Sequence, residues 1–170
     1  MSQIQPLVKI PVGVVIERRK AKSQWADFVW RPVAVLPGVP DAAPGTVLDV
    51  DAERTNFYGG AATIKLYRSD SSGYRDNLAT GTAVLWVVLR PTGAEPPYEV
   101  AAVTAEPSEG ESFTESGANL VEAVTMPDSV RAIVSDFVAV HYFEHQFVKR
   151  TRDRADPEAM ARRAPSKDRK

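Results

Sequence analysis

A short pattern near the C-terminal end is the part of the chain that most resembles a catalytic motif. His141, Glu144 and His145 match H-x-x-E-H, in which two histidines four residues apart bind zinc and the glutamate activates water. Enzymes with this pattern need a third zinc ligand far downstream, but only 25 residues follow His145 and their sole glutamate is Glu158. A small zinc-dependent hydrolase built on these three residues is therefore only an alternative. His141 is instead expected to lie on the apolar side of a helix.

Other catalytic machinery is missing from the sequence. The chain has no cysteine, which excludes thiol nucleophiles, Cys-ligated zinc and disulfides within this chain. No serine lies in a G-x-S-x-G elbow, and the only Gly-Gly pair, Gly59–Gly60, does not lead into the G-K-[ST] of a phosphate-binding loop. We therefore predict that the protein is not an enzyme and has no cofactor and no metal site.

Charge is distributed unevenly along the chain. The formal net charge is -1, but residues 149–170 carry nine Lys or Arg against four Asp or Glu, which leaves twelve against eighteen for residues 1–148. A basic tail on an acidic body can contact nucleic acid or an acidic protein surface. The tail lacks the repeated aromatic residues of single-strand binders. Nucleic-acid binding through the tail is therefore a second alternative, and the sequence does not favour it.

Nothing in the sequence predicts insertion into a membrane. The first eleven residues lack a basic stretch followed by a long apolar segment, and no apolar run reaches the roughly 18 residues of a membrane helix. Together with the lack of cysteine, this predicts a cytoplasmic protein without membrane contact.

The segment 25–38 is the best candidate for a binding surface. Trp25 follows a charged connector at 18–24, and Trp30 begins an apolar run that ends at a Pro-Gly pair. Aromatic and arginine side chains contribute much of the binding energy in protein interfaces. Core packing is the alternative for both tryptophans, and Trp25 is the one we expect to be exposed. The predicted partner-binding residues are Trp25, Trp30, Arg31, Pro37, Gly38, Lys149, Arg150 and Arg152.

Apolar runs predict seven strands. Pro32 lacks a backbone donor, so its strand must lie at a sheet edge or carry a bulge. Gly59–Gly60 is predicted to form a tight hairpin turn between two strands. The run 83–89 is apolar on both faces, as in a covered central strand, with Trp86 in the core. The predicted strands span 7–17, 28–36, 55–58, 62–68, 83–89, 98–104 and 120–124.

Two helices complete the predicted fold. Asp70 or Ser71 begins a short helix that ends before Gly81. Pro127 opens a long C-terminal helix, in which apolar residues recur at helical spacing. The predicted domain, residues 5–148, is α+β: a bent, mostly antiparallel sheet or partly closed barrel of six or seven strands packed by one long C-terminal helix. Residues 149–170 are predicted to be a disordered basic tail.

Several segments together resemble a bacterial protein family. The most specific are Trp30-Arg31-Pro32 and the Phe-Val-Lys-Arg run that begins at Phe147, and the resemblance extends to about Asp153. The family consists of bacterial proteins of unknown function whose genes often sit among those for molybdenum- or tungsten-type formate dehydrogenases and their maturation factors. The resemblance implies no activity, cofactor or catalytic residue. It implies a non-enzymatic accessory protein that binds a protein partner, a formate dehydrogenase subunit or a maturation factor, during assembly or maturation of that enzyme.

Overall fold

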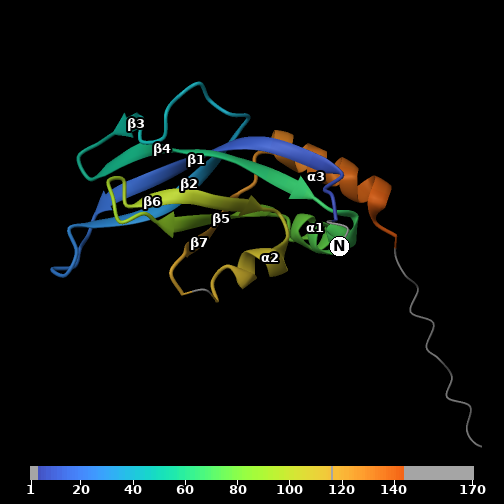
Figure 1. Ribbon diagram of the computed structural model, residues 1–170. Helices are drawn as coiled ribbons and strands as arrows, with labels where there is room; N and C mark the ends of the chain where they lie inside the picture. The colour runs from blue at the N-terminus through green and yellow to red at the C-terminus, as the bar shows by residue number, and fades with distance from the viewer. Residues whose placement is uncertain (1–3, 116, 144–170) are drawn as a thin grey trace, which may run out of the picture.

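The computed structural model describes residues 4–115 and 117–143 and shows two antiparallel sheets (Figure 1). The first sheet has the strand order β2-β1-β4-β3, and the second has the order β6-β5-β7. Apolar side chains of both sheets and of two helices form one continuous core. The architecture is therefore α+β, with two sheets sharing a single core.

The first sheet is built around a long strand that is buried on both faces along its middle. Val12, Val14 and Ile16 alternate along β1 and face the core. On the outer face of β1, a Cβ added to Gly13 would lie 2.9 Å from Pro40, because the loop after β2 crosses there. The strands of this sheet are β1 (Val8–Lys20), β2 (Phe28–Pro37), β3 (Val47–Val50) and β4 (Arg54–Leu66).

The second sheet confirms the prediction of a covered central strand. It consists of β5 (Val84–Pro91), β6 (Tyr98–Thr104) and β7 (Leu120–Thr125), with β5 in the middle. Trp86 is not in the core, however. It is half-buried on the opposite face of β5, beneath α2 (Pro107–Ser112), where a Cβ on Gly110 would overlap its ring.

Two helices close one end of the space between the sheets. The short helix is confirmed: the 3-10 helix η1 (Arg68–Asp70) leads into α1 (Ser71–Ala79), and Gly81 follows with φ 80°. Asn77 of α1 is buried, and its amide donates to the carbonyls of Val84 and Ala105 at 2.8 and 2.9 Å. These bonds fix α1 to the second sheet, because an unpaired buried amide would be costly. α3 (Asp128–His141) packs against α1 through the edge-to-face contact of Phe137 with Tyr74.

The predicted fold is wrong in two respects. The strands form two separate sheets, not one bent sheet or a partly closed barrel, because the chain passes from one sheet to the other through η1 and α1. The predicted long C-terminal helix is also wrong. α3 has 14 residues, close to an ordinary helix length, and Tyr142 follows it in an extended conformation. The predicted tail, 149–170, lies outside the described residues.

Gly59–Gly60 does not form the predicted hairpin turn. β4 runs through this pair without a break, and its register on β1 shifts there: Val14 lies opposite Gly60, and Val15 lies opposite Tyr58. The extra residue, Gly59, forms a β-bulge. A Cβ at that position would lie 2.5 Å from the Ile16 side chain. Glycine is therefore needed to let Ile16 pack against the β4 backbone.

Both alternatives predicted for the strand that contains Pro32, a sheet edge and a bulge, are confirmed. β2 is the edge strand of the first sheet, and its pairing with β1 shifts between Val15 and Ile16, which lie opposite Ala34 and Pro32. Val33 is the extra residue of this second bulge.

Candidate functional site

The first candidate residue, Trp25, lies at the tip of the hairpin that joins β1 to β2. The loop 21–27 is closed at its base by a hydrogen bond from the Ala21 amide to the Asp27 carbonyl at 3.0 Å. The Trp25 side chain is 88% exposed, so core packing is not its role. We call loop 21–27, with β1 from Glu17 onward and β2 as far as Arg31, the hairpin end.

Trp30 and Arg31 lie in the hairpin end on opposite faces of the sheet, since successive residues of a strand alternate. Trp30 is half-buried and packs against the core, where its ring stacks on Phe57 with centroids 5.7 Å apart. Arg31 lies on the outer face and donates from Nε to Glu17 at 3.1 Å. Trp30 therefore packs on the core side of the sheet, whereas Arg31 is part of the outer surface of the hairpin end.

Pro37 and Gly38 lie at the other end of β2. Pro37 lies six positions after Arg31 along the strand, or roughly 20 Å at about 3.3 Å per residue. The Gly38 amide donates to Pro11 at 3.1 Å, near the beginning of β1. The structure therefore brings Trp25 and Arg31 to one end of the sheet and leaves Pro37–Gly38 at the other.

The inner face of the hairpin end holds an arginine among three aromatic rings. β1 extends past the predicted strand end, so Arg18 belongs to the strand and lies directly opposite Trp30. Its guanidinium carbon is 4.7, 5.3 and 5.9 Å from the ring centroids of Phe28, Phe57 and Trp30. Such cation–π contacts each contribute about 0.5–1 kcal/mol at exposed sites. They hold the ends of β1, β2 and β4 together beyond the apolar core.

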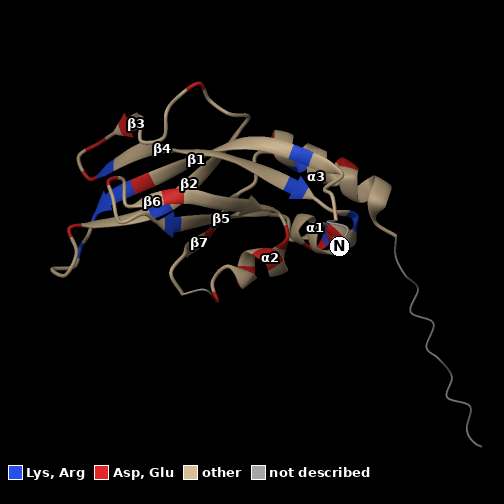
Figure 2. Ribbon diagram, viewed as in Figure 1, with Lys and Arg blue, Asp and Glu red and all other residues tan. Residues whose placement is uncertain are grey.

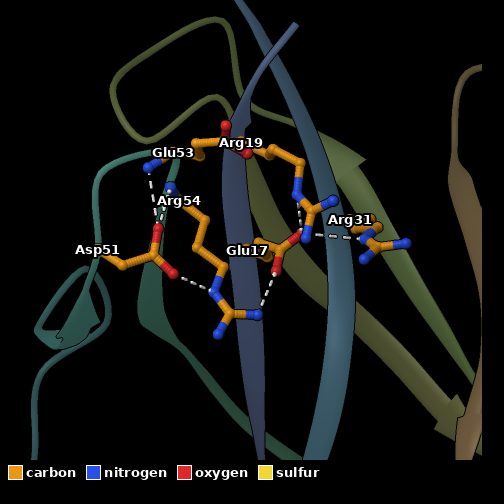
Figure 3. A network of polar contacts seen from close by, with 6 residues as sticks. All are labelled: Glu17, Arg19, Arg31, Asp51, Glu53 and Arg54. Atoms are coloured by element: carbon orange, nitrogen blue, oxygen red, sulfur yellow. Dashed lines mark hydrogen bonds and ion pairs between the residues drawn. The ribbon is translucent and has the colours of Figure 1, made fainter.

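The outer face of the hairpin end is organised by one buried carboxylate. Glu17 is 2% exposed and directly follows the buried apolar residues of β1 that end at Ile16. Arg31, Arg19 and Arg54 approach its carboxylate at 3.1, 3.3 and 3.9 Å, from β2, β1 and β4 (Figure 3). The cross-strand pairing explains this gathering, since Glu17 lies directly opposite Arg31 on one side and Asn56 on the other. A buried charge is tolerated because cations surround it.

The turn between β3 and β4 extends this network. The Asp51 carboxylate accepts from the backbone amides of Glu53 and Arg54, both at 2.9 Å, and pairs with Nε of Arg54 at 2.6 Å (Figure 3). The two backbone hydrogen bonds are the main reason that the pKa of Asp51 is below its ordinary value, and Arg54 lowers it further. The Asp51–Arg54 pair thereby holds one of the arginines around Glu17.

Positive charge dominates a hollow beside this network. Figure 2 shows Lys and Arg gathered where β1 ends. The hollow has a volume of about 320 Å³, and four of its lining residues are cationic against the single anionic Glu17. It is lined by Glu17, Arg19, Lys20, Ala21, Lys22, Val29 and Arg31.

Large apolar side chains are exposed next to the charged groups. Trp25, Phe28 and Val29 of the hairpin end are 88%, 42% and 52% exposed. Phe28 follows loop 21–27 directly, and Val29 also lines the charged hollow. The hairpin end therefore combines exposed aromatic and aliphatic groups with arginines. Sequence reasoning missed Glu17 and Arg19; the available signal was a glutamate within a buried strand, which needs a partner.

The zinc pattern is described only in part. His141 is the last residue of α3 and contacts Phe137, with ring centroids 4.4 Å apart, as expected for the apolar side of the helix. Glu144 and His145 lie outside the described residues, as do Lys149, Arg150 and Arg152. Within the described ranges, no group of three or more His, Asp or Glu side chains is placed to hold a metal ion.

None of the helices in residues 4–115 and 117–143 is both long and apolar enough to span a membrane.

Comparison with known proteins identifies a family and no characterised relative. A family model described as "Protein of unknown function (DUF3305)" matches residues 11–151, which is most of the chain. The search of curated proteins and the search of solved structures found no match. The matched range begins within β1 and contains the rest of both sheets, α3 and the whole hairpin end. The chain therefore belongs to the DUF3305 family of proteins of unknown function.

Proposed function

We propose that this protein is a non-enzymatic, cytoplasmic accessory protein that binds a protein partner through its hairpin end. The observation that carries the proposal is the 88% exposure of Trp25 beside exposed Phe28 and Val29. A tryptophan in water is unfavourable, and exposed apolar groups that cluster next to arginines are typical of protein-binding sites.

The hairpin end holds the base of the loop that carries Trp25 in a defined position. Arg18 lies among three rings on the inner face, Glu17 gathers three arginines on the outer face, and the Ala21–Asp27 hydrogen bond closes the loop. A preorganised anchor loses less conformational entropy when it binds, so more of the contact energy appears as affinity.

The perturbed ionisable groups of the described residues also support a non-enzymatic role. Burial raises the pKa of Tyr74 well above its ordinary value, and its hydroxyl accepts from the Tyr67 amide. The shifts at Asp51, Arg54 and Arg75 follow from hydrogen bonds to neighbouring groups of the fold. Each of these shifts is explained by burial or by neighbouring groups of the fold, so none of them requires a catalytic role.

The proposed partner is a formate dehydrogenase subunit or a maturation factor of that enzyme. This choice rests on the sequence resemblance, which implies an accessory part in formate dehydrogenase assembly. Gene association points to a process and not to a mechanism, so a genetic test is the appropriate one.

The test is complementation of a deletion strain. Deleting the gene should lower formate dehydrogenase activity in extracts of cells grown with ample molybdate, and the wild-type gene should restore it. Trp25→Ala should fail to restore activity although the protein accumulates. The control Phe143→Ala, which removes an exposed ring two residues after α3, should restore it. Unchanged activity in the deletion strain would remove formate dehydrogenase from the proposal.

A further inference from the structure

We infer that the charged hollow of the hairpin end binds a carboxylate of an acidic segment of the partner. The inference rests on the proposed function and adds the chemistry by which the partner is recognised. The hollow adjoins the loop that carries Trp25, since Ala21 and Lys22 of that loop form part of its wall. An apolar anchor and a charge-specific contact would then lie side by side on one surface.

The charge balance of the hollow favours an anionic group. Arg19, Lys20, Lys22 and Arg31 line it, and only Glu17 opposes them. Glu17 is 2% exposed, whereas the side chains of Arg19 and Arg31 are 46% and 45% exposed. The negative charge therefore lies beneath the cations, which are the groups that an approaching ligand meets.

Glu17 also orients the two arginines. Both approach its Oε1 atom through Nε, at 3.3 Å for Arg19 and 3.1 Å for Arg31. Nε is the guanidinium nitrogen nearest the backbone, so the terminal nitrogens extend beyond the carboxylate. Within the described residues, no hydrogen bond occupies those terminal nitrogens. A guanidinium group can bind a carboxylate through two parallel hydrogen bonds. Here adjacent strands position two such groups, those of Arg19 and Arg31.

The size and walls of the hollow fit a side chain better than a large ligand. Its volume, about 320 Å³, lies at the lower limit of small-molecule pockets, which is roughly 300 Å³. Ala21 and Val29 supply apolar wall for the methylene groups of a glutamate. A glutamate in the hollow can place its main chain over loop 21–27, where Trp25 supplies apolar contact.

The test is binding of an acidic peptide to the full chain. Fluorescence anisotropy would be measured with a fluorescein-labelled peptide of alternating glutamate and glycine, and with the matched glutamine peptide as the uncharged control. Arg31→Ala and Lys22→Ala should each weaken binding by about tenfold, because each removes a cation that faces the bound carboxylate; tenfold corresponds to about 1.4 kcal/mol. Lys22→Ala leaves the contacts of Glu17 intact, so its effect cannot come from loss of the fold. Lys65→Ala changes the net charge equally on an exposed part of β4 and should change affinity less than twofold.

Equal weakening by Lys65→Ala would show binding by net charge alone and would overturn the site. If inorganic phosphate displaces the labelled peptide as strongly as unlabelled peptide does, the hollow binds small oxyanions in general. That result would overturn the inference that it recognises an acidic segment of the partner. If the partner is captured by wild type, lost with Trp25→Ala, and retained with both Arg31→Ala and Lys22→Ala, this inference fails and the proposed function stands. If the peptide binds as predicted but the deletion strain keeps its formate dehydrogenase activity, the hollow stands and the proposed partner fails.

Discussion

Replacing Glu17 with glutamine should destabilise the protein, because this buried carboxylate holds three strands together at the hairpin end. Its contact with Arg31 at 3.1 Å is a charge-assisted hydrogen bond, and Arg19 and Arg54 lie at 3.3 and 3.9 Å. Breaking a fully buried ion pair costs about 3–5 kcal/mol. The three arginines are 43–46% exposed and regain water when the charge is removed, so the loss should be smaller. We expect Glu17→Gln to lower the free energy of unfolding by about 2 kcal/mol, in the range for hydrogen bonds to charged groups.

This value can be measured by urea denaturation at neutral pH, followed by tryptophan fluorescence. A loss of about 2 kcal/mol corresponds to a decrease in Tm of roughly 4–8 °C for a chain of this size. The matched control is Glu99→Gln. Glu99 pairs with Arg90 at 2.6 Å, but its side chain is 51% exposed, so the change should stay within about 0.5 kcal/mol. Equal effects of the two substitutions, or a stabilisation by Glu17→Gln, would refute the role assigned to Glu17.

Three further predictions test other parts of the structure. Gly110→Ala should lower the free energy of unfolding by about 1–3 kcal/mol in urea melts, because the new methyl group overlaps Trp86. The control Glu111→Ala, in the same helix, should not lower it. A stabilised Gly110→Ala protein would show that α2 does not lie on Trp86. Trp30→Ala should cost about 1–3 kcal/mol, less than a fully buried tryptophan, and Trp25→Ala should stay within about 0.5 kcal/mol; equal losses would contradict their different burial. The pKa of Asp51 is lowered in the folded state, so the extra stability of wild type over Asp51→Asn should be fully present above about pH 4 and should shrink as the pH falls further. Urea melts at a series of acidic pH values measure this difference in unfolding free energy, and a difference that stays constant would contradict the assignment.

Local patterns predicted several elements well because their signals do not depend on distant partners. The predicted strand at 98–104 and the doubly apolar run at 83–89 became β6 and β5, and Pro32 correctly indicated an edge strand with a bulge. The short helix α1 was likewise indicated locally: Gly81 follows it with positive φ, although Asp70 at its N-cap makes no side-chain capping hydrogen bond. These features are determined by residues next to one another in the sequence.

Features determined by tertiary pairing could not be predicted in the same way. A Gly-Gly pair is equally suited to a hairpin turn and to a bulge, and the long pairing of β4 with β1 selected the bulge. The division into two sheets depends on strand pairing, which no local pattern specifies.

The candidate site shows the same limit for side chains. Exposure of Trp25 followed from its place after a polar segment. The gathering of Arg19, Arg31 and Arg54 at Glu17 depends on cross-strand register, so three strands had to be aligned before the site became visible.

The most direct test of the central claim is quantitative co-purification from the native host. Tagged wild-type protein, Trp25→Ala and Phe143→Ala would be crosslinked in cells, purified and compared by mass spectrometry. A formate dehydrogenase subunit or maturation factor should be enriched with wild type and Phe143→Ala and depleted with Trp25→Ala. Equal recovery of that partner with Trp25→Ala would contradict binding through the hairpin end, and no enrichment of any such protein with wild type would contradict the proposed partner.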